Sequence, residues 1–222
     1  VYRAVGHAEA FGISAGEPTI DLAVSQKRKD GVIDNLFKGL AGLLKQRKVT
    51  VYDGVGRLGA NRTVTVSGGE SGDVELTADA VILATGSKPR TIPGFEVDGS
   101  LVVTSDEVLS IDRVPDRAAV IGGGAIGCEF ASMMSDLGSQ VTILEAAPKI
   151  LPGCDEDAAK VVLRSFKKRK IDVKTGVAVQ GHTPAGDATT VNLADGVVGR
   201  GRHGGRVGGP PPVHRRARPR RN

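Results

Sequence analysis

The chain has no tryptophan, only two cysteines and no apolar run long enough to span a membrane. Cys128 and Cys154 lie 26 positions apart, a spacing that fits neither a disulfide framework nor a close-spaced metal site. A membrane helix needs about 18 consecutive apolar residues. The first residues also lack the charged and then apolar layout of a signal peptide. We therefore expect a cytoplasmic protein that has no metal site and no membrane contact.

Positive charge is concentrated at the end of the chain. Residues 196–222 hold eight arginines and no acid, so the remainder carries a net charge of −3 although the whole chain carries +5. This segment is rich in glycine and proline and shows no apolar period, so burial cannot offset its ordering entropy. Three interpretations are open: a disordered basic arm, a nucleic-acid-binding segment, or an out-of-frame translation of GC-rich coding sequence. The sudden change in composition favours the third.

A glycine-rich turn between an apolar run and a helical pattern is the most informative feature of the sequence. Residues 118–121 are typical of a buried parallel strand, and Gly122, Gly124 and Gly127 follow with dinucleotide-binding spacing. The first glycine permits a tight turn, the second lets the backbone approach a pyrophosphate, and the third allows close helix–strand packing. The phosphates would then lie on the N–H groups of a helix N-terminus.

The second half of this βαβ unit ends in a carboxylate. The predicted helix continues to Gly138, and an apolar strand over residues 141–144 leads to Glu145. That side chain is placed to accept the adenosine ribose hydroxyls and to repel a 2′-phosphate. Residues 117–145 therefore predict a site for NAD rather than NADP. Cys128, in the first turn of the helix, is expected to be a small packing residue.

The segment before this unit contains a long amphipathic pattern. Residues 21–48 predict a helix with one apolar face, formed by Ile33, Leu36, Phe37, Leu40, Leu43 and Leu44. Its basic residues are not interleaved with aromatics, so we interpret them as a solvated face rather than a nucleic-acid patch. Short strands are expected at residues 49–52, 63–66 and 74–76.

A continuous apolar run over residues 80–84 predicts a buried strand, which ends in the polar turn Thr85-Gly86-Ser87. In a doubly wound sheet ligands bind beyond the carboxyl ends of strands, so this turn either faces a nucleotide or simply ends the strand. Residues 104–107 form a capping-box pattern for a short helix. Beyond the βαβ unit, a helix is expected over 155–170, and strands over 171–173, 177–179 and 190–193.

Four stretches of the sequence resemble the flavin-dependent pyridine nucleotide–disulfide oxidoreductases, and within them the dihydrolipoyl dehydrogenases. They follow the family's order and spacing, and they are residues 43–56, 82–94, 104–107 and 121–131. The resemblance implies an α/β fold of Rossmann-like, doubly wound FAD- and NAD(P)-binding domains, truncated at both ends. It assigns the distal part of the FAD-binding domain to residues 1–115 and an incomplete NAD-binding domain to 116–195, before the tail at 196–222.

The resemblance also implies which residues bind the two cofactors, FAD and NAD. FAD contacts are implied at Gly56, Thr85, Gly86 and Ser87. NAD contacts are implied at Gly122, Gly123, Gly124, Ala125, Ile126, Gly127, Cys128, Glu129, Glu145 and Val179. Glu129 resembles the family's acid beside the nicotinamide, and an exposed helix carboxylate is the alternative.

Several parts of the family pattern do not occur in this sequence. They are the glycine-rich unit that holds FAD, the redox-active Cys-x4-Cys pair, and the C-terminal interface domain with its His/Glu proton relay. The histidines match no catalytic position and are expected at the surface: His7, His182, His203 and His214. The sequence therefore assigns no catalytic residue to this chain.

The parent enzyme implied by the resemblance oxidises dihydrolipoyl groups of 2-oxoacid dehydrogenase complexes, through an active disulfide and FAD, and reduces NAD. Its substrate is a small molecule or a lipoyl domain, and it is a homodimer. We expect this chain to be an inactive fragment that retains nicotinamide binding. The alternatives are a mercuric reductase, glutathione reductase or soluble transhydrogenase, a non-catalytic nucleotide-binding module, and an arginine-rich nucleic-acid binder. Glu145 argues against the NADP-using glutathione reductases.

Overall fold

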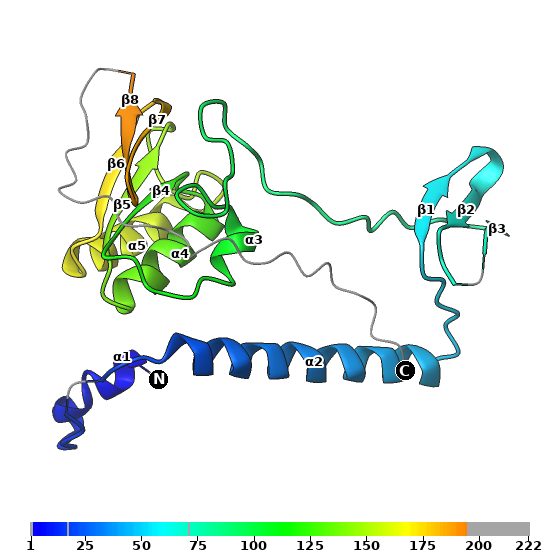
Figure 1. Ribbon diagram of the computed structural model, residues 1–222, viewed down its shortest axis with the longest axis horizontal. Coiled ribbons are helices and arrows are strands. Elements are labelled where there is room, and N and C mark those ends of the chain that lie inside the picture. Colours follow the sequence, from blue (N-terminus) through cyan, green and yellow to red (C-terminus); the bar gives the residue numbers. More distant parts are fainter. Residues whose placement is uncertain (1, 17, 71, 195–222) are drawn as a thin grey trace. The chain divides into compact units, whose positions relative to one another are not determined.

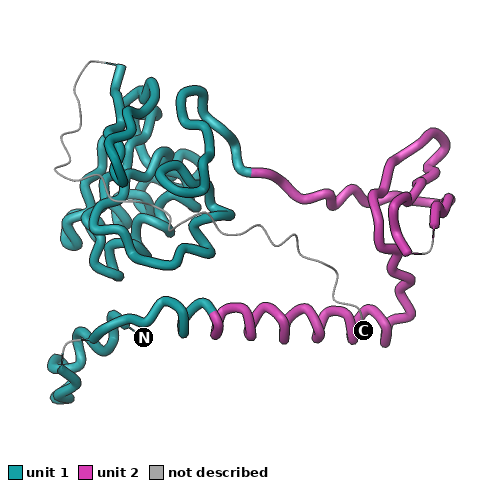
Figure 2. Tube along the Cα trace, viewed as in Figure 1, with its two compact units in different colours: residues 1–26, 89–222 teal, residues 27–88 magenta. Residues whose placement is uncertain are grey.

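The computed structural model describes residues 2–16, 18–70 and 72–194, and Figure 1 shows its elements. The chain divides into two compact units, one made of Val1–Gln26 with Pro89–Asn222 and the other of Lys27–Lys88 (Figure 2). The predicted tail at 196–222 lies outside the described residues. Within those residues, no helix combines the length and apolar character needed to cross a bilayer.

The first unit contains the expected βαβ arrangement. Strands β4 (Arg117–Ile121), β5 (Gln140–Glu145) and β6 (Asp172–Thr175) form a parallel sheet in the order β4-β5-β6. Helix α4 (Ala125–Asp136) connects the first two strands, and α5 (Glu156–Lys168) connects the second and third. These elements confirm the Rossmann-like α/β fold and the strands and helices predicted over residues 118–173.

The core of this unit lies between the sheet and the two helices. Val141 and Ile143 of β5 are almost fully buried and pack with Met134 of α4 and Phe166 of α5. Because side chains alternate across a strand, Thr142 and Leu144 lie on the opposite face of the sheet. The two faces of β5 therefore have different roles, since one forms the core and the other lines a cavity.

The ends of the two helices follow from local chemistry. Gly138 has a φ of 106°, and the N–H of Ser139 donates to the carbonyl of Met134, which is the hydrogen-bonding pattern of a Schellman cap. Asp155 caps the N-terminus of α5 by accepting from the N–H of Asp157 at 2.9 Å. Helix α4 therefore ends and helix α5 begins where the sequence predicts, whereas α5 ends at Lys168, two residues before the predicted end.

Smaller elements complete the first unit. Strands β7 (Val179–Ala185) and β8 (Ala188–Leu193) form an antiparallel hairpin. The chain begins with α1 (Tyr2–Val5) and the 3-10 helix η1 (Ala8–Phe11). Helix α3 (Ser105–Val108) has the predicted capping box, in which Thr104 accepts from Asp106 and Glu107 accepts from Thr104.

The second unit has its own antiparallel sheet. Strands β1 (Val55–Leu58), β2 (Thr63–Ser67) and β3 (Val74–Thr77) are hydrogen-bonded in sequence order, with the 3-10 helix η2 (Ala60–Arg62) between the first two. Helix α2 (Leu22–Gln46) begins in the first unit and continues into the second. None of its residues is buried, and its predicted apolar face is exposed.

Three strand predictions were wrong. Residues 49–52 and 80–84 are not in strands, and Ile82 is 90% exposed. An apolar run forms a strand only where another strand accepts its hydrogen bonds, and no described strand pairs with either run. The strand predicted over 177–179 begins instead at Val179, because the N–H of Val177 donates to Glu145 at the end of the parallel sheet.

Candidate dinucleotide-binding site

The glycine-rich loop leads directly from β4 into α4. Gly122 has a φ of 105°, which L side chains rarely adopt, and a Cβ at Gly127 would overlap the carbonyl oxygen of Gly122. These two positions require glycine for different reasons, one for its backbone conformation and the other for close packing. The space around Gly124 is open, since a Cβ placed there would meet no atom within 4 Å.

The open space beside Gly124 lies at the N-terminus of helix α4. Gly124 is the N-cap residue, and its carbonyl accepts the first helical hydrogen bond, from Cys128, at 2.9 Å. The first N–H groups of a helix have no acceptor within the helix, and the helix dipole favours negative charge there. No acidic residue occupies the first turn. This arrangement fits the phosphates of a dinucleotide.

Glu145 holds the loop from the neighbouring strand. One carboxylate oxygen, Oε2, accepts the N–H of Gly123 at 2.5 Å, and Oε1 accepts the N–H of Ala147 at 2.6 Å. The carbonyl oxygen of Gly123 in turn accepts the N–H of Leu151 at 2.7 Å. A Cβ at Gly123 would clash with Ile150, which is fully buried. The backbone of Gly123 is therefore fixed by the last residue of β5 and by Leu151, which follows that strand.

Cys128 packs beneath the same loop. Its side chain is buried, and the thiol donates to the carbonyl of Gly123 at 3.4 Å. Burial raises the pKa of the Cys128 thiol, and the carboxylate of Glu145 and the thiol of Cys154 raise it further. The thiol therefore remains protonated at neutral pH, which agrees with a packing role. Cys154 is exposed, and neither cysteine forms a disulfide.

The other residues assigned to NAD lie on α4 and at the start of β7. Ala125, Ile126 and Glu129 are exposed on the first two turns of α4. Val179 is half-buried where β7 begins. The structure therefore brings the glycine-rich loop and Glu145 into direct contact, and it leaves the side chain of Glu129 accessible to solvent.

The residues assigned to FAD belong to the other unit. Gly56 is an exposed residue of β1, and Thr85, Gly86 and Ser87 are exposed in a segment without helix or strand. Gly86 has a φ of 74°, as expected for a glycine in a polar turn. Within the described residues these four positions make no enclosed site.

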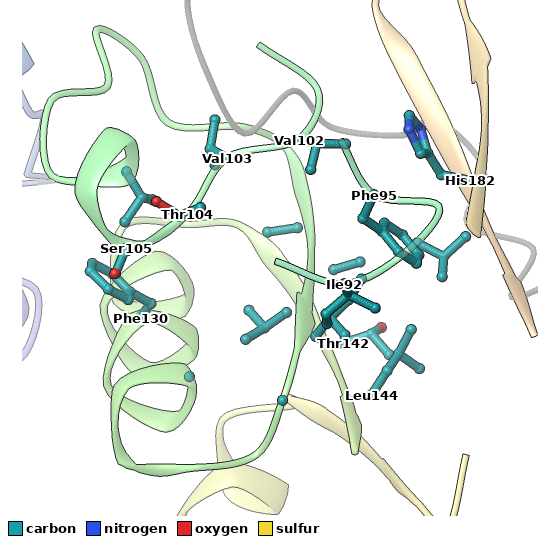
Figure 3. Close-up of a pocket in the computed structure, with 18 of the residues that line it drawn as sticks. Ile92, Phe95, Val102, Val103, Thr104, Ser105, Phe130, Thr142, Leu144 and His182 are labelled. Carbon is teal, nitrogen blue, oxygen red and sulfur yellow. The ribbon is translucent and has the colours of Figure 1, made fainter. Parts of the chain in front are cut away.

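The first unit also contains a cavity that the sequence did not predict. Its volume is about 760 Å³, and it lies over the sheet face that carries Thr142 and Leu144 (Figure 3). Phe95 stacks on His182 at its wall, with a centroid separation of 5.6 Å, and Nδ1 of His182 lies 2.8 Å from Oγ1 of Thr189. His182 is thus half-buried, and the prediction that it lies at the surface was wrong.

The cavity extends to the glycine-rich loop, because Gly122, Gly124 and Gly127 form part of its wall. Most of its other wall residues are apolar, including Ile92 and Val102 (Figure 3). These residues come from a loop, the sheet and a hairpin. A periodic sequence pattern marks only one element at a time, so no signal in the sequence joins these segments.

Comparison with known proteins agrees with this geometry. Residues 2–201 match the family described as pyridine nucleotide-disulphide oxidoreductase. The chain belongs to this oxidoreductase family. The match includes both the glycine-rich loop and the segment that carries Gly56 and residues 85–87. The resemblance stated from four short stretches is therefore confirmed over most of the chain.

The curated relatives include bacterial dihydrolipoyl dehydrogenases. The enzyme of Bacillus subtilis (strain 168) is 39% identical over 188 residues, which are 81% of this chain and 40% of the relative. That of Zymomonas mobilis is 38% identical over 200 residues, or 89% of this chain and 43% of the relative. The chain thus spans about two fifths of the length of these relatives.

Solved structures give the same family and a similar coverage. LpdA from Mycobacterium tuberculosis superposes with a TM-score of 0.73 at 27% identity, covering 82% of this chain and 41% of that protein. The HOCl-induced flavoprotein disulfide reductase RclA from Escherichia coli gives a TM-score of 0.65 at 25% identity, over 87% of this chain and 42% of its own.

Proposed function

We propose that residues 117–145 bind NAD, with the pyrophosphate on the N-terminus of α4 and the adenosine ribose at Glu145. The observation that carries this proposal is the contact of the Glu145 carboxylate with the N–H of Gly123. It supports the proposal because it holds a carboxylate, which would accept the ribose hydroxyls, next to Gly124, where a Cβ would meet no atom within 4 Å. The carboxylate would repel a 2′-phosphate, so NAD is favoured over NADP.

The roles within this site follow from position. Gly124, Ala125 and Ile126 would offer backbone N–H groups to the phosphates, and Gly127 keeps the helix close to β4. Glu129, one turn further along α4, is exposed and would lie toward the nicotinamide end. Val179 would contact the adenosine. When bound, NAD supplies a hydride acceptor, and the part of the protein is to position it.

For FAD, we propose that Gly56 and residues 85–87 form part of a flavin site whose pyrophosphate-binding portion is not among these 222 residues. These four positions lie in the family match, and the relatives with solved structures include flavoproteins. They supply no helix N-terminus for a pyrophosphate, because the structure describes none at Gly56 or at 85–87. We therefore expect weak flavin binding by this chain.

For the whole enzyme, we propose the dihydrolipoyl dehydrogenase reaction, in which a dihydrolipoyl dithiol is oxidised to the cyclic disulfide and NAD⁺ is reduced to NADH with release of a proton. The names of the curated relatives support it. We propose that this chain alone does not carry out the reaction, because Cys128 is buried and no described cysteine is paired with it. A lipoyl-domain substrate and a homodimeric parent are part of the same proposal.

A second candidate within the family is another flavin-dependent disulfide reductase, and RclA as a structural neighbour favours it. In this proposal the carboxylate of Glu145 would disfavour the 2′-phosphate of NADP, so a reductase that uses NAD is the candidate. Because the chain contains no tryptophan, NADH fluorescence can be followed without tryptophan emission. Titration of the chain with NADH tests the proposal. Saturable enhancement that ADP reverses supports it, and a response no larger than that of a G127A variant would contradict it.

A further inference from the structure

Leu151 has an unusual backbone conformation in the loop that follows β5. Its φ is 52°, in the left-handed region that residues with a side chain rarely adopt. It also precedes Pro152, and a residue before proline normally adopts an extended conformation. Strain of this kind persists only where the surrounding contacts require it, and it is concentrated at functional sites. Leu151 is therefore held in this conformation by its contacts.

Three contacts hold Leu151 in place. Its side chain packs against the hydrophobic core, its carbonyl accepts the N–H of Cys154 at 2.9 Å, and its N–H donates to the carbonyl of Gly123 at 2.7 Å. The Gly123 carbonyl also accepts the thiol of Cys128 at 3.4 Å. Because a carbonyl oxygen has two lone pairs, these two donors satisfy it completely. The direction of the Gly123 carbonyl is therefore set by two donors.

The direction of this carbonyl also sets the direction of the next N–H group. The peptide between Gly123 and Gly124 is trans, so its C=O and its N–H point in opposite directions. Since the carbonyl points toward Leu151, the N–H of Gly124 points away from Leu151. Among the described residues none accepts this N–H, and a Cβ at Gly124 would meet no atom within 4 Å. An N–H group without an acceptor, at the N-terminus of a helix, can bind an anion.

Glycine on both sides makes this peptide easy to reverse. Glycine adopts positive and negative φ alike, so neither Gly123 nor Gly124 prevents the reversal. A reversed peptide would direct the N–H of Gly124 inward and would turn the carbonyl of Gly123 toward the position of the phosphates, which it would repel. The reversal would also leave the N–H of Leu151 without its acceptor, and this cost opposes it.

We propose that Leu151 is a positioning residue for the pyrophosphate of the dinucleotide. Through its left-handed backbone it holds the Gly123–Gly124 peptide in the orientation that presents the N–H of Gly124 to the phosphates. This inference rests on the proposed NAD site. Glu145 fixes the preceding peptide, between Gly122 and Gly123, so two consecutive peptides of the loop are fixed by two different residues.

The test compares L151A with L151G in titrations of the full chain with NADH. Both variants remove the part of the side chain that packs in the core, but alanine retains the cost of a positive φ and glycine does not. L151A should therefore leave the left-handed conformation and lose the bond to Gly123. It should bind NADH about tenfold more weakly than L151G, the effect of about one hydrogen bond. If Leu151 acted through side-chain packing alone, L151A would bind NADH at least as tightly as L151G, and this result would overturn the proposal.

Adenosine and ADP distinguish the phosphate contact from the rest of the site. ADP carries the pyrophosphate and adenosine does not, and the affinity of each is measured by competition with NADH. L151A should weaken the binding of ADP as it weakens that of NADH, and it should leave the affinity for adenosine unchanged. An equal loss of affinity for adenosine would mean that Leu151 supports the whole site rather than the phosphate contact, which contradicts the proposal.

Lys170 provides a matched control for the backbone effect. It is exposed in the turn after α5 and has a φ of 58°. K170G should be more stable than K170A, for the same reason that L151G should be more stable than L151A. Both Lys170 variants should bind NADH as the unchanged chain does. A difference in NADH affinity between them as large as that between the Leu151 variants would assign the effect to stability in general and would refute the positioning role.

Hydrogen exchange of the ligand-free chain separates a failure of this proposal from a failure of the NAD site. The N–H at position 151 should exchange slowly in the unchanged chain and in L151G, and rapidly in L151A, because only L151A loses the bond to Gly123. Saturable NADH binding together with rapid exchange at position 151 of the unchanged chain overturns the positioning role alone. If the unchanged chain does not bind NADH, the proposed NAD site is wrong, and the positioning role is wrong with it.

Discussion

The carboxylate of Glu145 accepts the backbone N–H of Gly123 at 2.5 Å, although the two residues are 22 positions apart. This bond joins the end of β5 to the turn that follows β4. It fixes the peptide group between Gly122 and Gly123, and it places a carboxylate beside the N-terminus of α4. The same side chain therefore orders the loop, and in our proposal it also selects the nucleotide.

Gly127 is predicted to be essential for packing, because any Cβ there overlaps the carbonyl of Gly122. A G127A variant should lose about 1–3 kcal/mol of unfolding free energy, the usual range for overpacking, and should bind NADH poorly. G124A is the matched control, since its Cβ would meet no protein atom. It should unfold at nearly the same denaturant concentration as the unchanged chain while still binding NADH more weakly. Equal stability of the two variants would contradict this account of the loop.

The two cysteines should differ in their reaction with a thiol reagent. Cys154 is exposed and should be labelled quickly, whereas Cys128 is buried and has a raised pKa. A time course of labelling at about pH 8 should therefore show rapid reaction of one thiol, that of Cys154. The thiol of Cys128 should react only after the chain is denatured. C154S should remove the fast phase alone. Rapid labelling of Cys128 in the folded chain would be incompatible with its position beneath the loop.

Asp98 should contribute to stability in a pH-dependent way. Burial raises the pKa of its carboxyl, but N–H groups of the following turn and nearby His182 outweigh this effect and lower the pKa overall. Two of these donors are Ser100 at 2.8 Å and Val102 at 2.9 Å. Because the pKa of Asp98 is lower in the folded than in the unfolded chain, its ionised carboxylate stabilises the folded state at pH values above the unfolded pKa of about 3.9. This stabilisation is lost as the pH falls through the folded-state pKa. The stability difference between the unchanged chain and D98N should thus shrink between about pH 5 and pH 2, and a constant difference would exclude this role.

The chain should show no reduction of NAD by dihydrolipoamide, even with FAD added. Thiol–disulfide exchange needs a thiolate and a second sulfur within reach. Cys128 is buried with a raised pKa, and both cysteines are free. The assay follows NADH absorbance, and the control is a variant in which both cysteines are serine. Activity above that control would mean that an active site exists which the described residues do not reveal.

The βαβ unit was predictable because each of its parts has a local cause. The apolar run before Gly122, the spacing of the three glycines and the capping roles of Gly138 and Asp155 depend only on neighbouring residues, and the structure confirms the elements that they predict. The contact between Glu145 and Gly123 was not predictable at this level. It requires β5 to pair with β4 in one register, which the sequence does not specify.

The strand predicted at residues 80–84 was wrong for a different reason. Apolar composition indicates that a segment is suited to burial, but a strand exists only where a partner accepts its hydrogen bonds. Helix α2 shows the contrasting case. A helix supplies its own hydrogen bonds, so α2 forms without burial of its apolar face, on which Leu36 is 70% and Phe37 71% exposed. The cavity by His182 escaped prediction because segments far apart in the sequence form it.

Calorimetric titration of the chain with NADH and with NADPH tests the central claim most directly. In our proposal Glu145 accepts the ribose hydroxyls and repels a 2′-phosphate, so NADH should bind more tightly than NADPH. E145A should narrow that preference by about 1–2 kcal/mol, the scale of one or two charge-assisted hydrogen bonds. E145Q keeps an acceptor for the N–H of Gly123 but carries no charge. Its preference for NADH over NADPH should lie between that of the unchanged chain and that of E145A. Equal or tighter binding of NADPH by the unchanged chain would contradict the assignment of Glu145 and of this unit to NAD.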